Sequence, residues 1–227
     1  MDERAVDDRT RGLEAAHRAA IDFLGSLDER PVWPRASLDE MMSAFGGPLP
    51  EEGTDAASVI EEMARRGDPG LVAIPGGRFF GFVIGGTHPA ALAADWLVST
   101  WDQNSGSATL TPTTVAMERI AGQWMLDLFG LPESASVGFV TGGQMANFTC
   151  LATARNAVLA RSGWNLSERG LRLAPAVRFV VGADRHGSID RAARFLGIGT
   201  DELVVIESDD QGRMRPEALE HALDQAT

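Results

Sequence analysis

The chain has 227 residues, of which 44% are hydrophobic, and its formal net charge is −12. This length and apolar content suffice for one large or two small globular domains and exclude a disordered chain. The negative charge would repel nucleic acid or an anionic membrane, so we expect neither as a partner, although a local cluster of donors can still bind a small anion.

The first 75 residues predict a helical arm. Apolar residues recur at helical spacing from Arg9 to Leu27, and DAASVIEEMARRG predicts a further helix. Between them, RPVWPRASLDEMMSAFGGPLPEEG is rich in proline and glycine, which favours an extended segment with one short helix. Two interpretations stay open: helices that pack on the rest of the chain, or an arm that is exchanged between subunits.

The next part of the chain predicts a strand and two helices. Paired glycines flank the apolar run Phe79–Ile84, which is typical of a strand between turns. Pro89 suits the first turn of one helix and Pro112 that of the next, where Thr111 is a candidate cap. The second helix carries an apolar stripe that we expect to face the core, formed by Met117, Ile120, Ala121, Trp124, Met125 and Leu128.

After Pro132 the pattern alternates between strand and helix. The predicted strands are SVGFVT, AVRFVVG and ELVVIES, and the predicted helices span Gln144–Arg161, Ser188–Leu196 and Arg215–Gln225. Nearly continuous valine, isoleucine and phenylalanine runs between helices are typical of a mostly parallel sheet covered on both faces. The sequence therefore predicts an α/β fold.

The turn between the first of these strands and its helix is a candidate anion site. Gly142 and Gly143 leave the backbone open to close approach, and a helix N-terminus presents free N–H groups and the positive end of the helix dipole. Beyond the carboxyl end of a strand in an open α/β sheet, this geometry suits a phosphate. The alternative is that the glycine pair only makes a tight turn. The spacing fits neither a Walker loop nor the G-x-G-x-x-G pattern.

His186 lies in the corresponding place after the second predicted strand, so both loops should face the same edge of the sheet. A lone histidine is often only structural, but its position beside a candidate phosphate loop favours a functional role. The spacing of the histidines and the single cysteine does not predict a metal site.

Three segments in order carry a resemblance to a known family: GGRFFGFVIGGTHPAALAADWL, TGGQMANFTCLATARN and RHGSIDRAARFLGIG. The chain resembles the pyridoxal-phosphate-dependent group II amino-acid decarboxylases, which include the aromatic-L-amino-acid and glutamate decarboxylases. The resemblance implies the fold-type I architecture, with a mixed, mostly parallel sheet covered by helices. It assigns residues 1–75 to an N-terminal helical arm that serves in dimerisation, and residues 76–227 to the first part of the large cofactor-binding α/β domain.

The resemblance also implies an activity and its site. The cofactor would be pyridoxal 5′-phosphate, the substrate an L-amino acid released as amine and CO2, and the enzyme a homodimer whose N-terminal segment covers the partner. The histidine matching His186 would be the catalytic residue that stacks on the pyridine ring. The cofactor phosphate would be held by the segment that contains Gly142, Gly143, Gln144 and Asn147.

The segment that matches Phe80 to Gly86 would line the substrate pocket, with Phe80, Ile84 and Gly85 as its candidate residues. Aromatic decarboxylases tend to carry larger or hydroxylated residues where this chain has Ile84 and the glycines, so their substrate preference is not carried over. Other functions also stay open: another fold-type I reaction, such as that of a lyase or an aminotransferase, or a non-catalytic module that binds a phosphate ligand.

All twenty basic residues of the chain are arginine. Members of this family hold the cofactor through a Schiff-base lysine and its ring nitrogen through an aspartate, both in a second half of the protein. We therefore expect the chain to be the N-terminal portion of a decarboxylase and to be inactive alone. A truncated chain, a split chain and a naturally lysine-free relative are all consistent with the sequence.

The cellular compartment is predicted from two features. Cys150 is the only cysteine, which excludes an internal disulfide framework and fits a reducing compartment. The N-terminal stretch MDERAVDDRTRGLEAA lacks the apolar core of a signal peptide, and no window approaches the length of a membrane span. We therefore expect a cytoplasmic protein.

Overall fold

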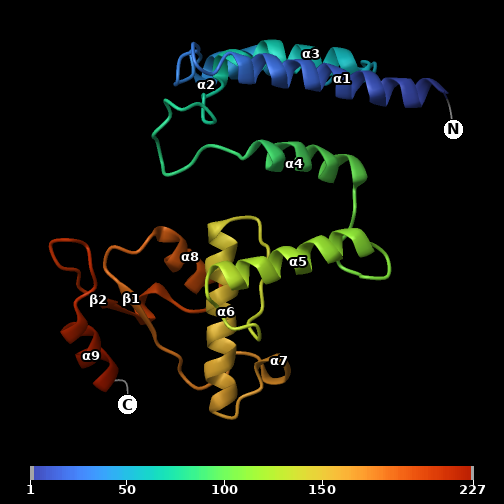
Figure 1. The fold of residues 1–227 in the computed structure, drawn as a ribbon. Coiled ribbons are helices and arrows are strands. Elements are labelled where there is room, and N and C mark those ends of the chain that lie inside the picture. The colour runs from blue at the N-terminus through green and yellow to red at the C-terminus, as the bar shows by residue number, and fades with distance from the viewer. Residues whose placement is uncertain (1–2, 226–227) are drawn as a thin grey trace. The chain divides into compact units, whose positions relative to one another are not determined.

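The computed structural model describes residues 3–225 and, for residues 3–7, only the backbone. The chain divides into two compact units, Met1–Gln103 and Asn104–Thr227, which are described in turn (Figure 1). The predicted division into residues 1–75 and 76–227 stays a prediction. Within the described residues, none of the helices is both long and apolar enough to cross a membrane.

The first unit is built on two long helices that lie side by side, α1 and α3 (Figure 1). The contact is close where Gly12 meets Ala56, because a Cβ on Gly12 would lie only 3.1 Å from the Cβ of Ala56. All the helices predicted in this unit are confirmed, although the first begins earlier than Arg9. The elements are α1 (Glu3–Gly25), α2 (Leu38–Phe45), α3 (Ala56–Gly67), the short 3₁₀ helix η1 (Asp68–Gly70) and α4 (Pro89–Trp101).

Acidic side chains fix the starts of α2 and α3. The backbone N–H of Ser37 donates to Glu40 Oε2 (2.7 Å), and that of Glu40 donates to Ser37 Oγ (3.3 Å), which completes a capping box. Asp55 Oδ1 accepts from the backbone N–H of Ser58 (3.1 Å) at the start of α3. The bond from the Ser37 backbone lowers the pKa of Glu40, and the hydrogen bonds from Ser58 lower the pKa of Asp55.

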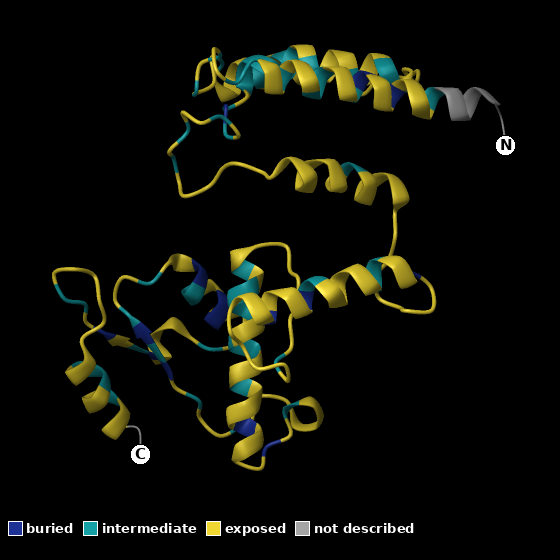
Figure 2. Cartoon of the chain, in the orientation of Figure 1, coloured by how far each residue is buried: buried dark blue, intermediate teal, exposed yellow. Residues whose placement is uncertain are grey.

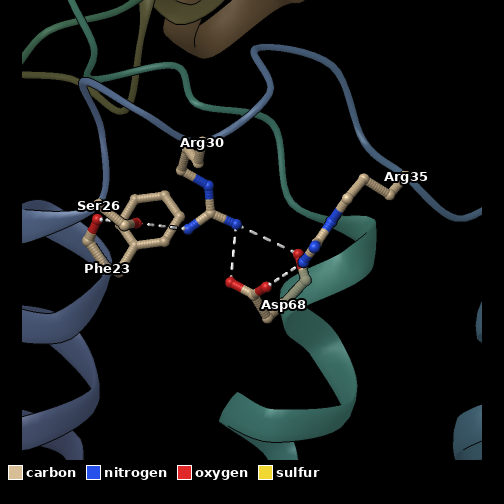
Figure 3. Close-up of polar contacts among 5 residues, drawn as sticks. All are labelled: Phe23, Ser26, Arg30, Arg35 and Asp68. Atoms are coloured by element: carbon tan, nitrogen blue, oxygen red, sulfur yellow. Dashed lines mark hydrogen bonds and ion pairs between the residues drawn. The ribbon is translucent and has the colours of Figure 1, made fainter.

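Arg30 ties the end of α1 to η1 (Figure 3). Its Nη2 donates to Asp68 Oδ1 (2.7 Å), its Nη1 donates to Ser26 Oγ (3.2 Å), and its guanidinium lies 4.4 Å from the centre of the Phe23 ring. Arg35 Nη2 donates to the other carboxylate oxygen of Asp68 (2.6 Å). The side chain of Arg30 is only 10% exposed and that of Arg35 is 57% exposed. Arg30 is therefore the inner partner of Asp68 and Arg35 the outer one.

The strand predicted over Phe79–Ile84 is wrong. This segment forms a turn in which Phe82 and Val83 have positive φ values of 58° and 54°. Gly85 follows with a φ of 119°, and a Cβ there would lie 2.9 Å from the carbonyl oxygen of Ile74, so the turn requires glycine at this position. Paired glycines on both sides of an apolar run are as compatible with a compact turn as with a strand.

The second unit contains a parallel pair of strands and the helices around it. β1 and β2 pair with Phe179 opposite Leu203 and Gly182 opposite Ile206. The core is formed by residues of both strands and of α8, against which Phe148, Leu151 and Ala152 of α6 pack. The elements are α5 (Pro112–Leu128), α6 (Gly143–Arg161), α7 (Leu166–Arg169), β1 (Phe179–Gly182), α8 (Gly187–Phe195), the 3₁₀ helix η2 (Thr200–Glu202), β2 (Leu203–Ile206) and α9 (Pro216–Asp224).

Two of the three strands predicted in this unit are confirmed, as β1 and β2. The third prediction, over residues 136–141, is wrong: this segment has no regular secondary structure and joins no sheet among the described residues. The side chains of Val137, Phe139 and Val140 in it are 38%, 52% and 41% exposed. A strand is defined by the neighbour that takes up its backbone hydrogen bonds, and a valine-rich run does not reveal whether that neighbour is present.

Helix α5 forms as predicted, with Thr111 at its N-cap position. The Thr111 side chain makes no capping hydrogen bond, because its hydroxyl donates to the carbonyl of Asn104 (2.5 Å). One expectation about α5 is wrong. The predicted core stripe is largely exposed, as Figure 2 shows along α5, and the buried residues are Gly122 and Leu126. Gly122 is buried because the chain passes close to it: a Cβ there would lie 3.5 Å from the Cβ of Val137. The exposed members of the stripe are Met117 (56%), Ile120 (46%), Trp124 (70%), Met125 (40%) and Leu128 (74%).

Candidate functional site

The candidate anion site is the first turn of α6. Gly142 precedes it with φ 158° and ψ 179°, a backbone conformation that is available essentially to glycine alone. The first intrahelical bond runs from the N–H of Ala146 to the carbonyl of Gly142 (3.0 Å). The N–H groups of Gly143, Gln144 and Met145 come before that bond and therefore point out of the helix end. Gly142 and Gly143 are exposed, and a Cβ on either would meet nothing within 4 Å.

His186 is the N-cap of α8. Its backbone is extended, with φ −67° and ψ 143°, and its Nδ1 accepts from the backbone N–H of Ser188 (3.2 Å). Asp190 lies in the first turn of α8, where a negative charge complements the helix dipole, and its Oδ1 accepts from Arg185 Nε (2.7 Å). The imidazole is exposed, although its Nδ1 is hydrogen-bonded to Ser188. His186 therefore has a fixed ring nitrogen and an accessible ring.

Ser188 joins the starts of the two helices. Its Oγ lies 2.8 Å from Asn147 Nδ2 and 2.9 Å from His186 Nδ1. Its carbonyl oxygen accepts from Gln144 Nε2 (3.2 Å). The structure thus brings together Gln144, Asn147 and His186, which the sequence predicted from separate motifs.

Two residues at this junction were missed by the sequence analysis. Ser188 is 5% exposed, and Arg191 Nη1 donates to Gln144 Oε1 (3.3 Å). The two residues are three apart on α8, so they lie on the same side of the helix. This spacing was visible in the sequence, but a serine near a helix start is more often a local capping residue, and an arginine there is more often a solvated one.

Contacts beyond the junction fix the position of α6 relative to α8. The rings of Phe148 and Phe195 meet edge to face with their centres 6.4 Å apart. Farther along, Arg155 Nη1 donates to the carbonyl of Leu196 at the end of α8 (2.8 Å). Ala192 and Ala193 are fully buried, so α8 approaches its neighbours without bulky side chains. The starts of α6 and α8 therefore rest on a packed core.

The residues predicted to line a substrate pocket lie in the first unit. Phe80 is 91% exposed and Ile84 is 56% exposed, while Gly85 holds the turn described above. Their role in substrate binding stays a prediction.

The groups gathered at α6 and α8 fit a phosphate ester attached to an aromatic ring. Three N–H groups at a helix start, next to glycines without side chains, are donors suited to the phosphate. The exposed imidazole offers a flat face to a ring, and the Gln144 amide and the Arg191 guanidinium supply further donors nearby. The donor set therefore fits pyridoxal phosphate, the cofactor that the resemblance implies.

Comparison with known sequences gives the family. Residues 39–227 match the pyridoxal-dependent decarboxylase conserved domain. The aromatic-L-amino-acid decarboxylase of Bacillus atrophaeus is 28% identical over 207 residues, which cover 88% of this chain and 39% of that protein. The cysteine sulfinic acid decarboxylase of Mus musculus is 31% identical over 166 residues, which cover 73% of this chain and 31% of that protein.

Comparison with solved structures gives the fold. The crystal structure of mouse CSAD superimposes with a TM-score of 0.85 at 26% identity, and the match covers 99% of this chain and 47% of that one. A structure of Oryza sativa TDC with PLP and tryptamine shares the fold, with a TM-score of 0.84 at 20% identity. The chain spans less than half the length of these relatives. The predicted fold-type I architecture and the predicted cofactor, pyridoxal phosphate, are confirmed. The chain belongs to the pyridoxal-dependent decarboxylase family.

Proposed function

We propose that this chain provides the phosphate site and the ring-stacking histidine of an enzyme that decarboxylates an L-amino acid to an amine and CO2. The observation that carries the proposal is the junction at Ser188, which holds the open N-terminus of α6 next to His186. Family membership supports the cofactor and the class of reaction. The assignment of individual residues rests on the geometry of the two helix starts.

In this proposal, each residue of the site has a binding or orienting task. The N–H groups of Gly143 and Gln144 bind the phosphate, and Gly142 keeps the approach open. The imidazole of His186 lies against the cofactor ring, and the hydrogen bond between its Nδ1 and Ser188 hinders rotation of the imidazole. Asn147 stabilises the junction through Ser188. When bound, pyridoxal phosphate supplies a ring that takes up the electron pair left as CO2 departs. The chain contributes by fixing the ring plane relative to the breaking bond.

The substrate class is supported by fewer observations than the cofactor site. We propose that Phe80, Ile84 and Gly85 line the amino-acid pocket, since the two side chains are exposed on a turn that glycine shapes. Two of the relatives are named for different substrates, one for aromatic L-amino acids and the other for cysteine sulfinic acid. The proposal is therefore limited to an L-amino acid.

We further propose that the lysine that attaches the cofactor comes from outside these 227 residues. All twenty basic residues of the chain are arginine, whose guanidinium does not serve as this amine. We call this chain together with the segment that carries the lysine the complete enzyme. On this proposal, the 227-residue chain alone holds the cofactor weakly and does not turn over.

Titration with pyridoxal phosphate tests the proposal. The complete enzyme should show the visible absorbance of a lysine-bound cofactor and release CO2 from an L-amino acid, while the chain alone should show neither. Analysis of the other product separates decarboxylation from aminotransfer. Robust turnover by the chain alone would contradict the proposal, and tight phosphate binding without turnover in the complete enzyme would favour a non-catalytic binding module.

Variants of His186 test its assigned role. His186→Ala should weaken cofactor binding about fivefold, because a stacked aromatic pair contributes about 1 kcal/mol, and it should also lower turnover. His186→Phe should recover more binding than activity, because it restores a flat ring but lacks the Nδ1 that is hydrogen-bonded to Ser188. Equal activity of wild type and His186→Ala would make His186 a structural residue only.

We also propose that the complete enzyme is a cytoplasmic homodimer. The first unit carries large apolar side chains at its surface, with Trp33 57% exposed and Phe45 51% exposed, which a subunit interface would cover. The single cysteine supports a reducing compartment. Light scattering of the complete enzyme should give the mass of two subunits, and a monomer would contradict the dimer.

A further inference from the structure

We propose that Ser188 is a positioning residue that fixes the tautomer and the orientation of His186 and couples them to α6. The inference rests on the proposed function, since it assigns Ser188 a part in orienting the cofactor. It goes beyond that function because it concerns a buried residue to which the proposed function assigns no contact with the cofactor or the substrate. Ser188 is 5% exposed, and its contacts run to three residues of the candidate site.

The positions of the hydrogens follow from which groups can only donate. The backbone N–H of Ser188 is a donor alone, and it points at His186 Nδ1 (3.2 Å). Nδ1 must therefore be the unprotonated nitrogen, so the neutral ring carries its proton on Nε2. The Ser188 hydroxyl, 2.9 Å from the same nitrogen, then donates its single hydrogen to Nδ1.

The Ser188 hydroxyl oxygen can also accept a hydrogen bond, and Asn147 supplies the donor. Because its hydrogen is used by His186, Ser188 Oγ is left as an acceptor, and Asn147 Nδ2 donates to it (2.8 Å). A directed chain of hydrogen bonds thus runs from Asn147 through Ser188 to His186. Such chains polarise their members and hold one arrangement more firmly than single bonds do.

Burial makes this chain hard to replace. Water has little access to Ser188, so a lost hydroxyl would leave the Asn147 amide without its acceptor and His186 Nδ1 with one donor instead of two. The Ser188 carbonyl holds Gln144, at the phosphate turn, through a separate bond (3.2 Å). A change of the Ser188 side chain should therefore disturb the imidazole more than the phosphate turn.

The first test reads the tautomer and does not depend on activity. Histidine is labelled with ¹⁵N in the complete enzyme without cofactor, and the His186→Gln variant identifies the His186 signals. At a pH where the ring is neutral, the Nδ1 resonance should show an unprotonated nitrogen. In Ser188→Ala the backbone N–H still points at Nδ1 and keeps it unprotonated, but the resonance should move away from its wild-type position because the hydroxyl donor is lost. A protonated Nδ1 in the wild type would overturn the proposal.

The second test compares kinetics. Ser188→Ala should lower kcat about tenfold, the factor that corresponds to one lost hydrogen bond of ordinary strength, and should change the KM for the amino acid less than about twofold. Ser188→Thr keeps the hydroxyl and should recover most of kcat. Ser162→Ala is the matched control, because the Ser162 hydroxyl bonds the carbonyl of Leu159 (2.8 Å) at the far end of α6. Its kinetics should equal those of the wild type.

The outcomes separate this inference from the proposed function. If the wild-type complete enzyme neither binds pyridoxal phosphate nor releases CO2, the proposed function fails, while the ¹⁵N measurement still tests the hydrogen-bond chain. If the wild type is active and Ser188→Ala is folded with unchanged kcat and an unchanged Nδ1 signal, the positioning role of Ser188 is wrong. A loss of kcat that Ser188→Thr does not recover would likewise count against a role for the hydroxyl.

Discussion

In the proposed function, Gly143 is the residue whose backbone geometry bears most directly on phosphate binding. It opens α6, it is exposed, and a Cβ there would meet nothing within 4 Å. The protein itself would therefore accept a side chain at this position. In the proposed function, glycine at this position keeps the first N–H groups of α6 open to the approach of an anion.

The substitution Gly143→Val should accordingly lower cofactor affinity and leave the fold intact. A β-branched side chain would stand in front of the N–H groups, and we expect the dissociation constant of pyridoxal phosphate in the complete enzyme to rise at least about tenfold, as for the loss of one charge-assisted hydrogen bond. Gly53→Val is the control, since Gly53 is also open on its Cβ side but lies outside the candidate site. Fluorescence titration measures both, and equal affinities would contradict the anion site.

Arg30 and Arg35 share one carboxylate but should differ in what they contribute to stability. Arg30→Gln removes the inner partner, which is 10% exposed, together with its contact on the Phe23 ring, and should lower the free energy of unfolding by about 1–3 kcal/mol. Arg35→Gln removes the outer partner, which is 57% exposed, and should cost less than about 1 kcal/mol. Urea unfolding of the two variants checks the order. A larger loss for Arg35→Gln would contradict the inner and outer assignment.

At the scale of elements, helices were easier to predict than strands. Helix starts are encoded locally: Pro89 and Pro112 lie in the first turns of α4 and α5, and Asp55 caps α3. Strands depend on partners that are distant in sequence. The two apolar runs with a parallel neighbour form β1 and β2, whereas residues 136–141, without one among the described residues, have no regular secondary structure.

The candidate site was predictable only in part, for the same reason. Gly142, Gly143 and His186 could be found because each lies at the start of a predicted helix. Ser188 could not be recognised, because its importance comes from the packing of α8 against α6, which a single sequence does not display. Conversely, the stripe on α5 was correctly placed on one face, but periodicity does not say whether that face is covered.

The helix caps of the first unit should make it sensitive to acid. The folded-state pKa of Asp55 lies below its ordinary value of 3.8 and that of Glu40 below 4.5, so both carboxylates stabilise the fold fully above these values. Their contribution should be lost as the pH falls through the lowered folded-state pKa values. Asn caps a helix without a charge, so Asp55→Asn should reduce the drop in melting temperature between neutral pH and pH below about 4. An unchanged drop in the variant would mean that the Asp55 cap does not contribute.

The molecule as a whole combines a strongly negative charge with a large apolar surface on α5. The charge of −12 opposes association between copies of the chain. The side chains of Met117 and Trp124 are 56% and 70% exposed, which favours association. Which effect dominates should depend on ionic strength, because salt screens the repulsion between charges while leaving apolar contacts in place.

The isolated chain should therefore self-associate as salt is raised, through the stripe on α5. Light scattering at increasing ionic strength should show a rising mass for the wild type, and Trp124→Gln combined with Met117→Gln should reduce the rise, because the substitutions remove apolar area from that face. Thr113→Gln is the control on the same helix, since Thr113 is exposed and polar. In the complete enzyme we expect the stripe to be covered, so the tryptophan emission that is lost on Trp124→Phe should lie at shorter wavelength than in the isolated chain. If the isolated chain and the complete enzyme emit at the same wavelength, Trp124 stays exposed to water in the complete enzyme. The self-association of the isolated chain would then have to use a surface other than the stripe on α5.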